Sequence, residues 1–441
     1  MEEVLMKEIC KNFGEHQLEL VNKLSFVRYG GTPEEEKAAR IIMEEIEQSG
    51  GSCELVPFRI PAFECSKCSI TVTEPYNRKI EAVPFGCTGS VEGDFDLIYV
   101  ERGEEMDYAG LRDLSNTVVL VNRCSYEAYR QICDRKPAAF IAISGKYYDT
   151  PDNSDLVAQP LRYEYRDMGR VPGFIIRAKD ATELVRDRVS RIHVELQQEE
   201  KEATSHDVLA VIPGTEDLEG DIVLTAHYDS ILVGTGSWDN ATGSVNLLHL
   251  YKYFLRNPAK RTLRFVWCGS EEQGLFGSHA YIEQNPDLVD KISFCFNFDM
   301  NGTVLGPNEI FITGGEDLKT YVEQYCREVG YSASTHIGVH SSDSAPFCDK
   351  GIPALGLSRG TNTAEIHTRR DLVGPLGADQ LQDIGVFSSG LVARVANSVI
   401  LPVERNLDDK MKEELDKYFY RAQKRKDEEK RNPEKKDQKK D

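Results

Sequence analysis

Short apolar runs alternate with segments of helical periodicity along the second half of this chain. The apolar runs lie at residues 208–212, 222–226, 263–268, 292–298 and 354–357, and helical spacing of apolar residues occupies 241–255 and 275–283. Strands and helices in alternation are typical of a sheet covered by helices on both faces. We therefore predict an α/β fold with a mixed, mostly parallel sheet for this part of the chain.

The first part of the chain begins with a helix signal. Thr32 precedes Pro33 and is followed three residues later by Glu35, the pattern of a capping box with proline at the first helical position. Apolar residues then recur at helical spacing up to Ile46, before a Gly-Gly pair. Two strand-like runs follow, at residues 53–60 and 69–73.

The pattern changes between residues 83 and 192. Short apolar strands are predicted at 96–100, 117–121 and 138–143, with a helix at 126–133 and a loop-rich stretch at 145–165. We interpret this segment as an inserted small β-rich domain. The predicted organisation is 1–82 and 193–403 as one domain, 83–192 as the insert and 404–441 as a charged tail.

The tail mixes lysine, arginine, glutamate and aspartate with few apolar residues. This composition predicts one solvated helix that frays into disorder, with a partner-binding tail as the alternative.

Composition excludes several classes of partner. The chain has 441 residues, 40% of them hydrophobic, enough for one large core and a second, smaller one. Its net charge of -20 argues against nucleic acid and against an anionic membrane surface. The N-terminus lacks a leader pattern and no apolar segment reaches 18 residues, so we expect a cytoplasmic protein; oligomeric state stays open.

Eleven cysteines are scattered through apolar contexts, which predicts reduced core thiols. Cys65 and Cys68 have CxxC spacing, but no second pair lies nearby. Two unpaired thiols on a strand edge are therefore favoured over a metal or redox role.

Candidate metal ligands follow several of the apolar runs. His227 comes directly after the run 222–226, and Asp229 lies two positions further, where its carboxylate can orient the imidazole. Asp239 stands in a glycine-bounded loop that leads into a predicted helix. Ligands in open α/β sheets collect at the carboxyl ends of strands, so we expect these side chains to lie along one edge of the sheet.

Two adjacent carboxylates, Glu271 and Glu272, follow the apolar run 263–268. Adjacent side chains in an extended segment point in opposite directions. One glutamate can therefore bind a metal while the other acts on a water molecule as a general base. Asp299 follows the run 292–298, and His367 lies beyond 354–357.

Together these side chains are typical of a two-metal hydrolase site. Two divalent cations about 3.5–4 Å apart need one bridging carboxylate, and one imidazole with one further carboxylate for each ion. The chain supplies this set from separate segments and leaves one glutamate for proton transfer.

In order and spacing, seven pieces of the chain resemble the co-catalytic dizinc aminopeptidases, the family that includes aminopeptidases Y and S. These pieces are AHYDS, WDNATG, SEEQGLFGS, NFDMNG, SDSAPF, GIPALGL and IHTRRD, and the resemblance covers residues 21–63 and 205–400. Residues 83–192 resemble, through VEGDFDLIYV, NTVVLVNR and PAAFIAIS, the protease-associated (PA) domain that many members carry at this point. The implied architecture is the zinc-peptidase fold with an inserted PA-like domain.

The resemblance implies two Zn²⁺ per chain and a peptide substrate with a free N-terminus, whose α-amine is held by carboxylates near the second metal. Carried over by position, it gives one zinc to His227 and Asp299, the other to Glu272 and His367, the bridge to Asp239 and the general base to Glu271. It also implies a cis peptide bond after Asp239.

The sequence departs from the family pattern beside the site. Ile366 stands where some members have a tyrosine that donates to the oxyanion, so the oxyanion donor is unassigned. Ser344 replaces a common histidine, whereas Asp343 is kept and is expected to orient a loop beside the site. His340 lies close enough to this loop to be a candidate substrate contact, and His249 is interpreted as structural.

The favoured interpretation is a metallo-aminopeptidase in which Glu271 is the base and Asp229 orients His227. Other metals with the same ligand preferences, cobalt and manganese, stay open alongside zinc. The alternatives are a related carboxypeptidase, a single-zinc glutaminyl cyclase, and an inactive relative that acts as a binding module. The complete ligand set argues against the inactive relative.

Overall fold

A computed structural model describes residues 13–431. The N-terminal residues inspected for a leader, and residues 432–441 of the charged tail, lie outside this range. The chain divides into two compact units, the first formed by residues 1–58 with 204–441 and the second by residues 59–203. Two long strands, β1 (Glu54–Glu74) and β9 (Arg191–Ile212), carry the chain from one unit to the other.

The first unit contains a sheet with the strand order β14-β13-β15-β12-β10-β11-β9. Its strands are β10 (Asp221–His227), β11 (Leu263–Cys268), β12 (Ile292–Phe298), β13 (Asn308–Thr313), β14 (Ala333–Ile337), β15 (Ala354–Arg359) and the end of β9. The central strands β11, β10, β12 and β15 are parallel, whereas β9 and β13 pair antiparallel with their neighbours. The predicted mixed, mostly parallel α/β fold is confirmed.

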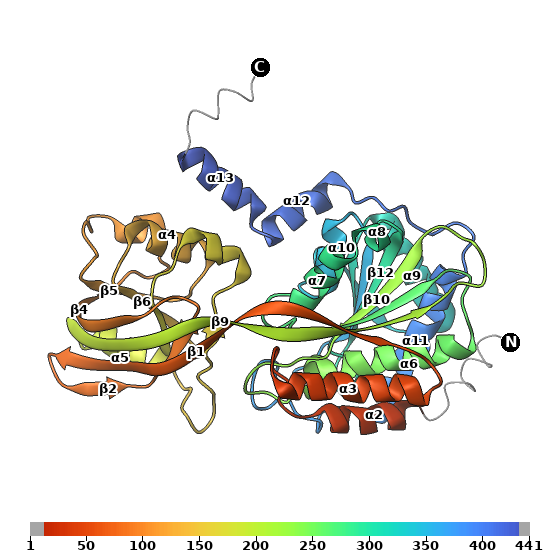
Figure 1. The fold of residues 1–441 in the computed structure, drawn as a ribbon, viewed down its shortest axis with the longest axis horizontal. Helices are drawn as coiled ribbons and strands as arrows, with labels where there is room; N and C mark the ends of the chain where they lie inside the picture. The colour runs from red at the N-terminus through yellow and green to blue at the C-terminus, as the bar shows by residue number, and fades with distance from the viewer. Residues whose placement is uncertain (1–12, 432–441) are drawn as a thin grey trace, which may run out of the picture. The chain divides into compact units, whose positions relative to one another are not determined.

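Helices cover both faces of this sheet (Figure 1). Side chains alternate along β10, so Ile222 and Leu224 enter one core while Val223 enters another. The first core packs against α2 (Phe13–Leu24), α3 (Pro33–Gln48), α6 (Thr242–Arg256), α9 (Glu316–Val329) and α11 (Ala378–Ala396). The second core packs against α7 (Phe276–Gln284), α8 (Pro286–Val289), α10 (Ser344–Asp349) and α12 (Asp409–Tyr418).

The predicted start of α3 is confirmed. Thr32 is its N-cap, and the Thr32 hydroxyl accepts a hydrogen bond from the backbone N–H of Glu35. The side chain of Glu35 does not complete the capping box, because it accepts instead from the backbone N–H of Gly31 at 2.6 Å. The runs predicted as two strands at 53–60 and 69–73 form one continuous strand, β1, so that expectation was wrong.

The second unit contains the end of β1, the beginning of β9 and a mixed set of strands that continues the sheet from the pairing of β9 with β4. Its remaining strands are β2 (Arg78–Ile80), β3 (Ala82–Gly86), β4 (Val91–Tyr99), β5 (Thr117–Val121), β6 (Ala139–Ser144), β7 (Gln159–Pro160) and β8 (Gly173–Arg177), with helices α4 (Tyr126–Arg135) and α5 (Ala178–Arg186). It has a separate apolar core. The predicted insert, 83–192, lies inside this unit, and its identity as a PA-like domain stays a prediction.

The charged tail differs from its expected form. Within the described residues it forms two helices, α12 and α13 (Arg421–Arg431). Met411 and Leu415 on α12 are each 3% exposed and pack in the second core with Phe347. The prediction of one solvated helix was therefore wrong, because two apolar residues four positions apart suffice to hold one face of α12 against the core.

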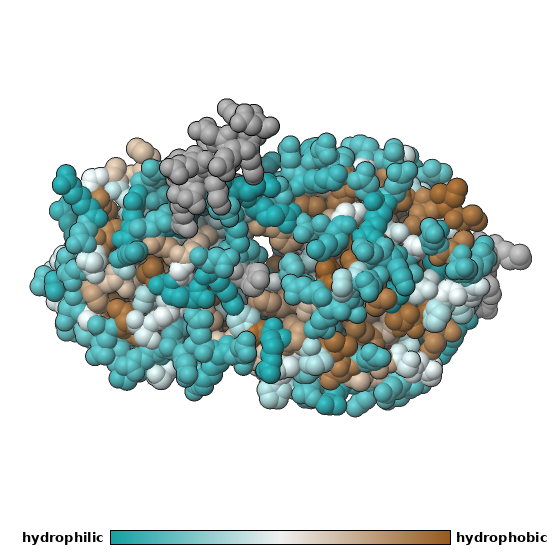
Figure 2. Space-filling view, turned by 45° about the horizontal axis from the view of Figure 1, so that its top comes forward, coloured by the Kyte–Doolittle hydropathy of each residue, from teal (hydrophilic) through white to brown (hydrophobic). Residues whose placement is uncertain are grey.

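The surface is largely hydrophilic on one face. Hydrophilic residues predominate on the face shown in Figure 2, with hydrophobic groups between them. Among residues 13–431, no helix combines the length and the apolar character that crossing a bilayer requires.

Candidate metal centre

The predicted ligands gather at one edge of the sheet in the first unit. His227 is the last residue of β10, Asp299 directly follows β12, and Glu272 lies four residues beyond the end of β11. Because these three strands are parallel, their carboxyl ends lie along the same edge. Asp239 reaches this edge from the loop before α6, and His367 from the loop after β15.

His227, Asp239 and Asp299 form the first ligand group, which we call group 1. Their ligand atoms all lie within 4.8 Å of one another. The Nε2 atom of His227 is 3.2 Å from Asp239 Oδ1 and 3.5 Å from Asp299 Oδ1. All three residues are buried.

Asp239, Glu272 and His367 form the second ligand group, which we call group 2. His367 Nε2 lies 3.2 Å from Asp239 Oδ2 and 3.0 Å from Glu272 Oε2. Asp239 is therefore common to both groups and turns one carboxylate oxygen toward each imidazole. Among the described residues, these two are the groups whose side chains could hold a metal ion.

The donor atoms fit divalent cations such as zinc. Imidazole nitrogens and carboxylate oxygens are its usual protein ligands, together with thiolates. Glu272 Oε1 and Asp299 Oδ1 are buried and accept no hydrogen bond within the described part of the chain. Buried polar atoms normally have partners, so these two oxygens are suited to coordinating a cation.

The carboxylates and imidazoles of the site shift one another's pKa values. Burial lowers the pKa of His227, but the charge of Glu271 and the hydrogen-bonding carboxylates of Asp229, Asp239 and Asp299 outweigh burial and raise it well above its ordinary value. Burial, together with the charge of Asp239, raises the pKa of Glu272 to about 7. Such crowding of buried carboxylates around two imidazoles favours the uptake of cations.

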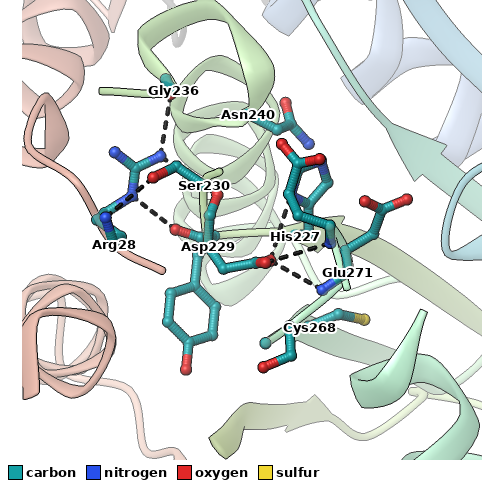
Figure 3. Close-up of polar contacts among 12 residues, drawn as sticks. Arg28, His227, Asp229, Ser230, Gly236, Asn240, Cys268 and Glu271 are labelled. Atoms are coloured by element: carbon teal, nitrogen blue, oxygen red, sulfur yellow. Dashed lines mark hydrogen bonds and ion pairs between the residues drawn. The ribbon is translucent and has the colours of Figure 1, made fainter. Parts of the chain in front are cut away.

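Asp229 connects several parts of the site. One of its carboxylate oxygens, Oδ1, lies 3.4 Å from Nδ1 of His227, as predicted for a residue that orients the imidazole. The same carboxylate accepts hydrogen bonds from the backbone N–H groups of Glu271 at 3.0 Å and Glu272 at 3.2 Å. Asp229 thereby fixes the backbone that carries both glutamates relative to His227 (Figure 3).

Glu271 belongs to neither ligand group, although its neighbour Glu272 belongs to group 2. Its backbone follows Ser270, which has a positive φ of 54°. Burial raises the pKa of Glu271 well above its ordinary value, with Asp343 and Glu272 adding to the effect. A carboxyl group beside a metal centre with a raised pKa has the properties of a general base that later acts as an acid.

The loop that carries Asp239 is held by Asp371. The Asp371 carboxylate accepts hydrogen bonds from the backbone N–H groups of Trp238 at 2.7 Å and Asp239 at 3.0 Å. The peptide bond between Asp239 and Asn240 is cis, which confirms the expectation from the resemblance. The Asn240 side chain then accepts from Gly243 N at 2.8 Å, at the start of α6.

Ser342 holds the carboxylate of Asp299 in place through a hydrogen bond. Its hydroxyl donates to Asp299 Oδ2 at 2.6 Å and accepts from Asn297 Nδ2 at 2.8 Å. Neither Ser342 nor Asp371 was assigned a role from the sequence. Both lie within quoted motifs, SDSAPF and IHTRRD, but which polar residues of a motif support the ligands depends on packing that spacing does not reveal.

The two candidate substrate contacts occupy different environments. Asp343 is completely buried just before α10, and burial raises its pKa to about 6. The ring of His340 stacks on Phe311 with 4.0 Å between ring centroids. Ile366, beside His367, has 37% of its surface exposed. Substrate contacts by Asp343 and His340 stay predictions.

The segment that carries the site matches a known protein family. Residues 207–391 match the family model described as Peptidase family M28, which confirms the resemblance over this segment. Aminopeptidase YwaD of Bacillus subtilis is 29% identical over 194 residues, 41% of this chain and 43% of that protein. The chain thus aligns with less than half the length of this curated relative.

Solved structures share the fold over most of the chain. An aminopeptidase from Aneurinibacillus sp. strain AM-1 has a TM-score of 0.73 with 22% identity, covering 92% of this chain and 100% of its own. A zinc aminopeptidase from Bacillus subtilis has a TM-score of 0.71 with 20% identity, covering 87% of this chain and 95% of its own. At these identities, the likeness shows the fold.

Proposed function

We propose that this chain, whose residues 207–391 match Peptidase family M28, is a zinc-dependent aminopeptidase that hydrolyses the N-terminal peptide bond of peptides. One observation carries the proposal: Asp239 turns one carboxylate oxygen toward His227 and the other toward His367, each at 3.2 Å. This is the arrangement that a carboxylate bridging two cations requires. The names of the relatives, aminopeptidases and a zinc aminopeptidase, support the same activity.

Each residue has a proposed position. His227 and Asp299 would hold one zinc and Glu272 and His367 the other, with the Asp239 carboxylate shared between them, since it belongs to both ligand groups. When bound, the two ions would lower the pKa of a shared water toward about 7 and polarise the scissile carbonyl.

Glu271 transfers the proton. In this proposal, its carboxylate takes a proton from the attacking water and returns it to the leaving amine, so the peptide bond breaks without a net change in protonation of the enzyme. The backbone hydrogen bond from Glu271 N to Asp229 holds the glutamate beside His227. The raised pKa of Glu271 suits a group that must hold the proton between the two steps.

Carboxylates beside the metals also suit the substrate's free α-amine. A protonated or metal-bound amine is stabilised by negative charge, and Glu272 and Asp239 supply it in group 2. An N-blocked peptide lacks this interaction. The proposal therefore predicts dependence on a free N-terminus.

The test combines metal content with a substrate panel. The full chain is loaded with Zn²⁺, freed of excess metal and analysed for zinc per chain, then assayed with aminoacyl chromogens and their N-acetyl forms. Two zinc ions per chain with cleavage of the unblocked substrates alone is the expected result. Cleavage of N-blocked peptides from the C-terminus would identify a carboxypeptidase, one zinc with cyclisation of N-terminal glutamine would identify a cyclase, and zinc binding without turnover would identify a binding module.

A further inference from the structure

Arg28 is a buried cation whose side chain donates its hydrogen bonds to backbone carbonyl groups. It lies between α2 and α3, is 0% exposed, and has no carboxylate among the hydrogen-bond acceptors of its side chain. Burial lowers the pKa of Arg28 to about 10, so it stays charged at neutral pH. Burying an unpaired guanidinium is costly, so the carbonyl groups that surround it must offset a large desolvation penalty.

The carbonyl groups around Arg28 come mainly from the segment between His227 and Asp239. Nε donates to Tyr228 O at 2.7 Å, and Nη2 donates to Gly236 O at 2.9 Å and to Asp229 O at 3.5 Å. Nη1 donates to Thr235 O. One planar side chain therefore ties the start of this segment to its end.

Backbone contacts strengthen the same connection. The N–H of Arg28 donates to Ser230 Oγ at 2.9 Å, and Ser230 N donates back to Arg28 O at 3.2 Å. Gly236 has a positive φ of 54°, and a Cβ added there would lie 2.9 Å from Arg28 Nη2 and 2.6 Å from Asp239 O. The close approach of the loop to the guanidinium thus requires glycine at this position.

The two ends that Arg28 ties together lead to different ligands. At one end, the Asp229 side chain contacts His227 and accepts hydrogen bonds from the backbone of Glu271 and Glu272. At the other end, Gly236 is three residues before Asp239. Figure 3 shows Arg28 and Glu271 on opposite sides of Asp229, with Gly236 beside the guanidinium.

We propose that Arg28 is a positioning residue of the metal centre: by holding the Tyr228–Asp229 and Thr235–Gly236 backbones at a fixed separation, it sets where Asp229 and Asp239 stand relative to each other. This inference rests on the proposed two-metal function. The hydrogen bonds of the Arg28 side chain go to backbone carbonyl groups and to none of the proposed ligand side chains, so its effect is transmitted through the backbone. The planar fork of arginine is needed, because a lysine ammonium cannot reach carbonyl groups on both sides at once.

The chain offers a matched control in Arg261. It is also buried, at 3% exposed, and its side chain also donates to backbone carbonyls, those of Glu219, Ser398 and Val399. It lies two residues before β11 begins, near the amino ends of the strands and thus at the sheet edge opposite the ligands. Arg261→Lys therefore causes the same chemical change without affecting the ligand loops.

The experiment measures zinc affinity of the full chain by competition with a chelator, and the absorption spectrum of the Co²⁺-loaded chain. We expect Arg28→Lys to weaken zinc binding about 10- to 100-fold, the range for residues that orient metal ligands, and to change the Co²⁺ spectrum. Arg261→Lys should change zinc affinity less than about 3-fold and keep the spectrum. Equal effects of the two substitutions, or none at Arg28, would overturn the inference.

A milder variant covers the case in which Arg28→Lys does not fold. Ser230→Ala removes the hydroxyl that accepts from Arg28 N but leaves the guanidinium in place. It should weaken zinc binding by less than the roughly 10- to 100-fold expected for Arg28→Lys; unchanged affinity would contradict the inference. The wild-type titration separates the two proposals, because a wild-type chain that binds no zinc refutes the proposed function, whereas normal wild-type binding with unaffected variants refutes only the role of Arg28.

Discussion

The two ligand groups share Asp239 but are built in different ways. In group 1, the side chains of His227 and Asp299 are 2% and 6% exposed and sit where β10 and β12 end. In group 2, the side chain of His367 is 56% exposed and lies on a loop, with a positive φ of 56°. The sheet therefore fixes group 1, whereas group 2 depends on a loop that solvent reaches.

This difference has a consequence for metal binding. A ligand on a rigid strand end loses little freedom when it coordinates an ion, whereas a ligand on an exposed loop must be ordered at some cost. Water also reaches His367 more easily than His227. We expect the ion in group 1 to bind more tightly and leave more slowly than the ion in group 2.

Replacing Asp239 should have the largest effect, because it is the residue common to both groups. Asp239→Ala should reduce zinc content below one ion per chain and remove measurable peptidase activity, as checked by metal analysis and an aminoacyl chromogen assay. Asp221→Ala is the control, since Asp221 pairs with Arg264 at the start of β10 and lies away from the ligands. If Asp239→Ala kept two zinc ions, Asp239 would not be the bridge.

The histidine substitutions compare the groups directly. His367→Ala should leave one tightly held zinc in group 1, and His227→Ala should leave one loosely held zinc in group 2. Treating the wild-type chain with a chelator should release zinc in two phases, with the His367→Ala chain showing only the slower one. Release in a single phase, or the faster phase in the His367→Ala chain, would contradict the difference between the groups.

The adjacent glutamates should separate catalysis from metal binding. Glu271→Gln should lower kcat by about 10²- to 10⁴-fold while two zinc ions stay bound, because a positioned base contributes that much to the rate. Glu272→Gln should instead lose the zinc of group 2. Metal analysis alongside kcat distinguishes the two, and loss of a zinc ion from the Glu271→Gln chain would show that the roles are assigned the wrong way round.

Ser342 should act on group 1 alone. Ser342→Ala removes the hydroxyl that donates to Asp299 at 2.6 Å, and should weaken the tighter zinc by about 10- to 100-fold. Ser341→Ala is the neighbouring control, because the Ser341 hydroxyl contacts Tyr418 at 2.8 Å and is exposed. The rates of the two phases of zinc release to a chelator are measured for both variants. If Ser342→Ala accelerated the faster phase and left the slower phase unchanged, Ser342 would not support group 1.

The same contrast explains what the sequence could reveal about the site. The strand-end ligands His227 and Asp299 follow apolar runs, so their position at one edge follows from the sheet. His367 lies eight residues beyond β15, so the sheet does not fix its position: the ligand count made it a candidate, and the resemblance assigned it to one zinc. Arg28 gave no signal, because an arginine after a helix is ordinarily exposed and its burial depends on a loop 200 residues away.

The fold was predictable to a similar degree. Strands β10, β11 and β12 and helices α6 and α7 lie within two residues of their expected bounds, because buried parallel strands are continuous apolar runs. Two stated expectations were wrong, those for residues 53–73 and for the charged tail. The continuity of β1 through residues 64–67 accompanies its pairing with β2 and β9, and within α12 the buried residues are the two apolar side chains Met411 and Leu415.

The smallest expected effect concerns a second buried histidine, His249 on α6, whose surroundings differ from those of His227. Carboxylates raise the pKa of His227, whereas His249 is 2% exposed and packs edge-on against Phe13, where burial, with a contribution from Lys252, lowers its pKa to about 3. Between about pH 6.5 and pH 3, His249 is protonated in the unfolded chain but neutral in the folded chain. Stability from neutral His249 is therefore complete above about pH 6.5 and is lost as the pH falls toward 3.

The expected loss at His249 is about 2 kcal/mol between pH 6.5 and pH 5, at 1.36 kcal/mol per pH unit. Denaturant unfolding of the wild type and of His249→Gln at pH 5, 7 and 8 measures it. Because the metal centre titrates in both proteins, only the difference between them reports on His249. The difference in free energy of unfolding between the two proteins should be the same at pH 8 and pH 7, and should shift in favour of the variant by about 2 kcal/mol at pH 5. If the difference were the same at all three pH values, His249 would be protonated in the folded chain as easily as in the unfolded one.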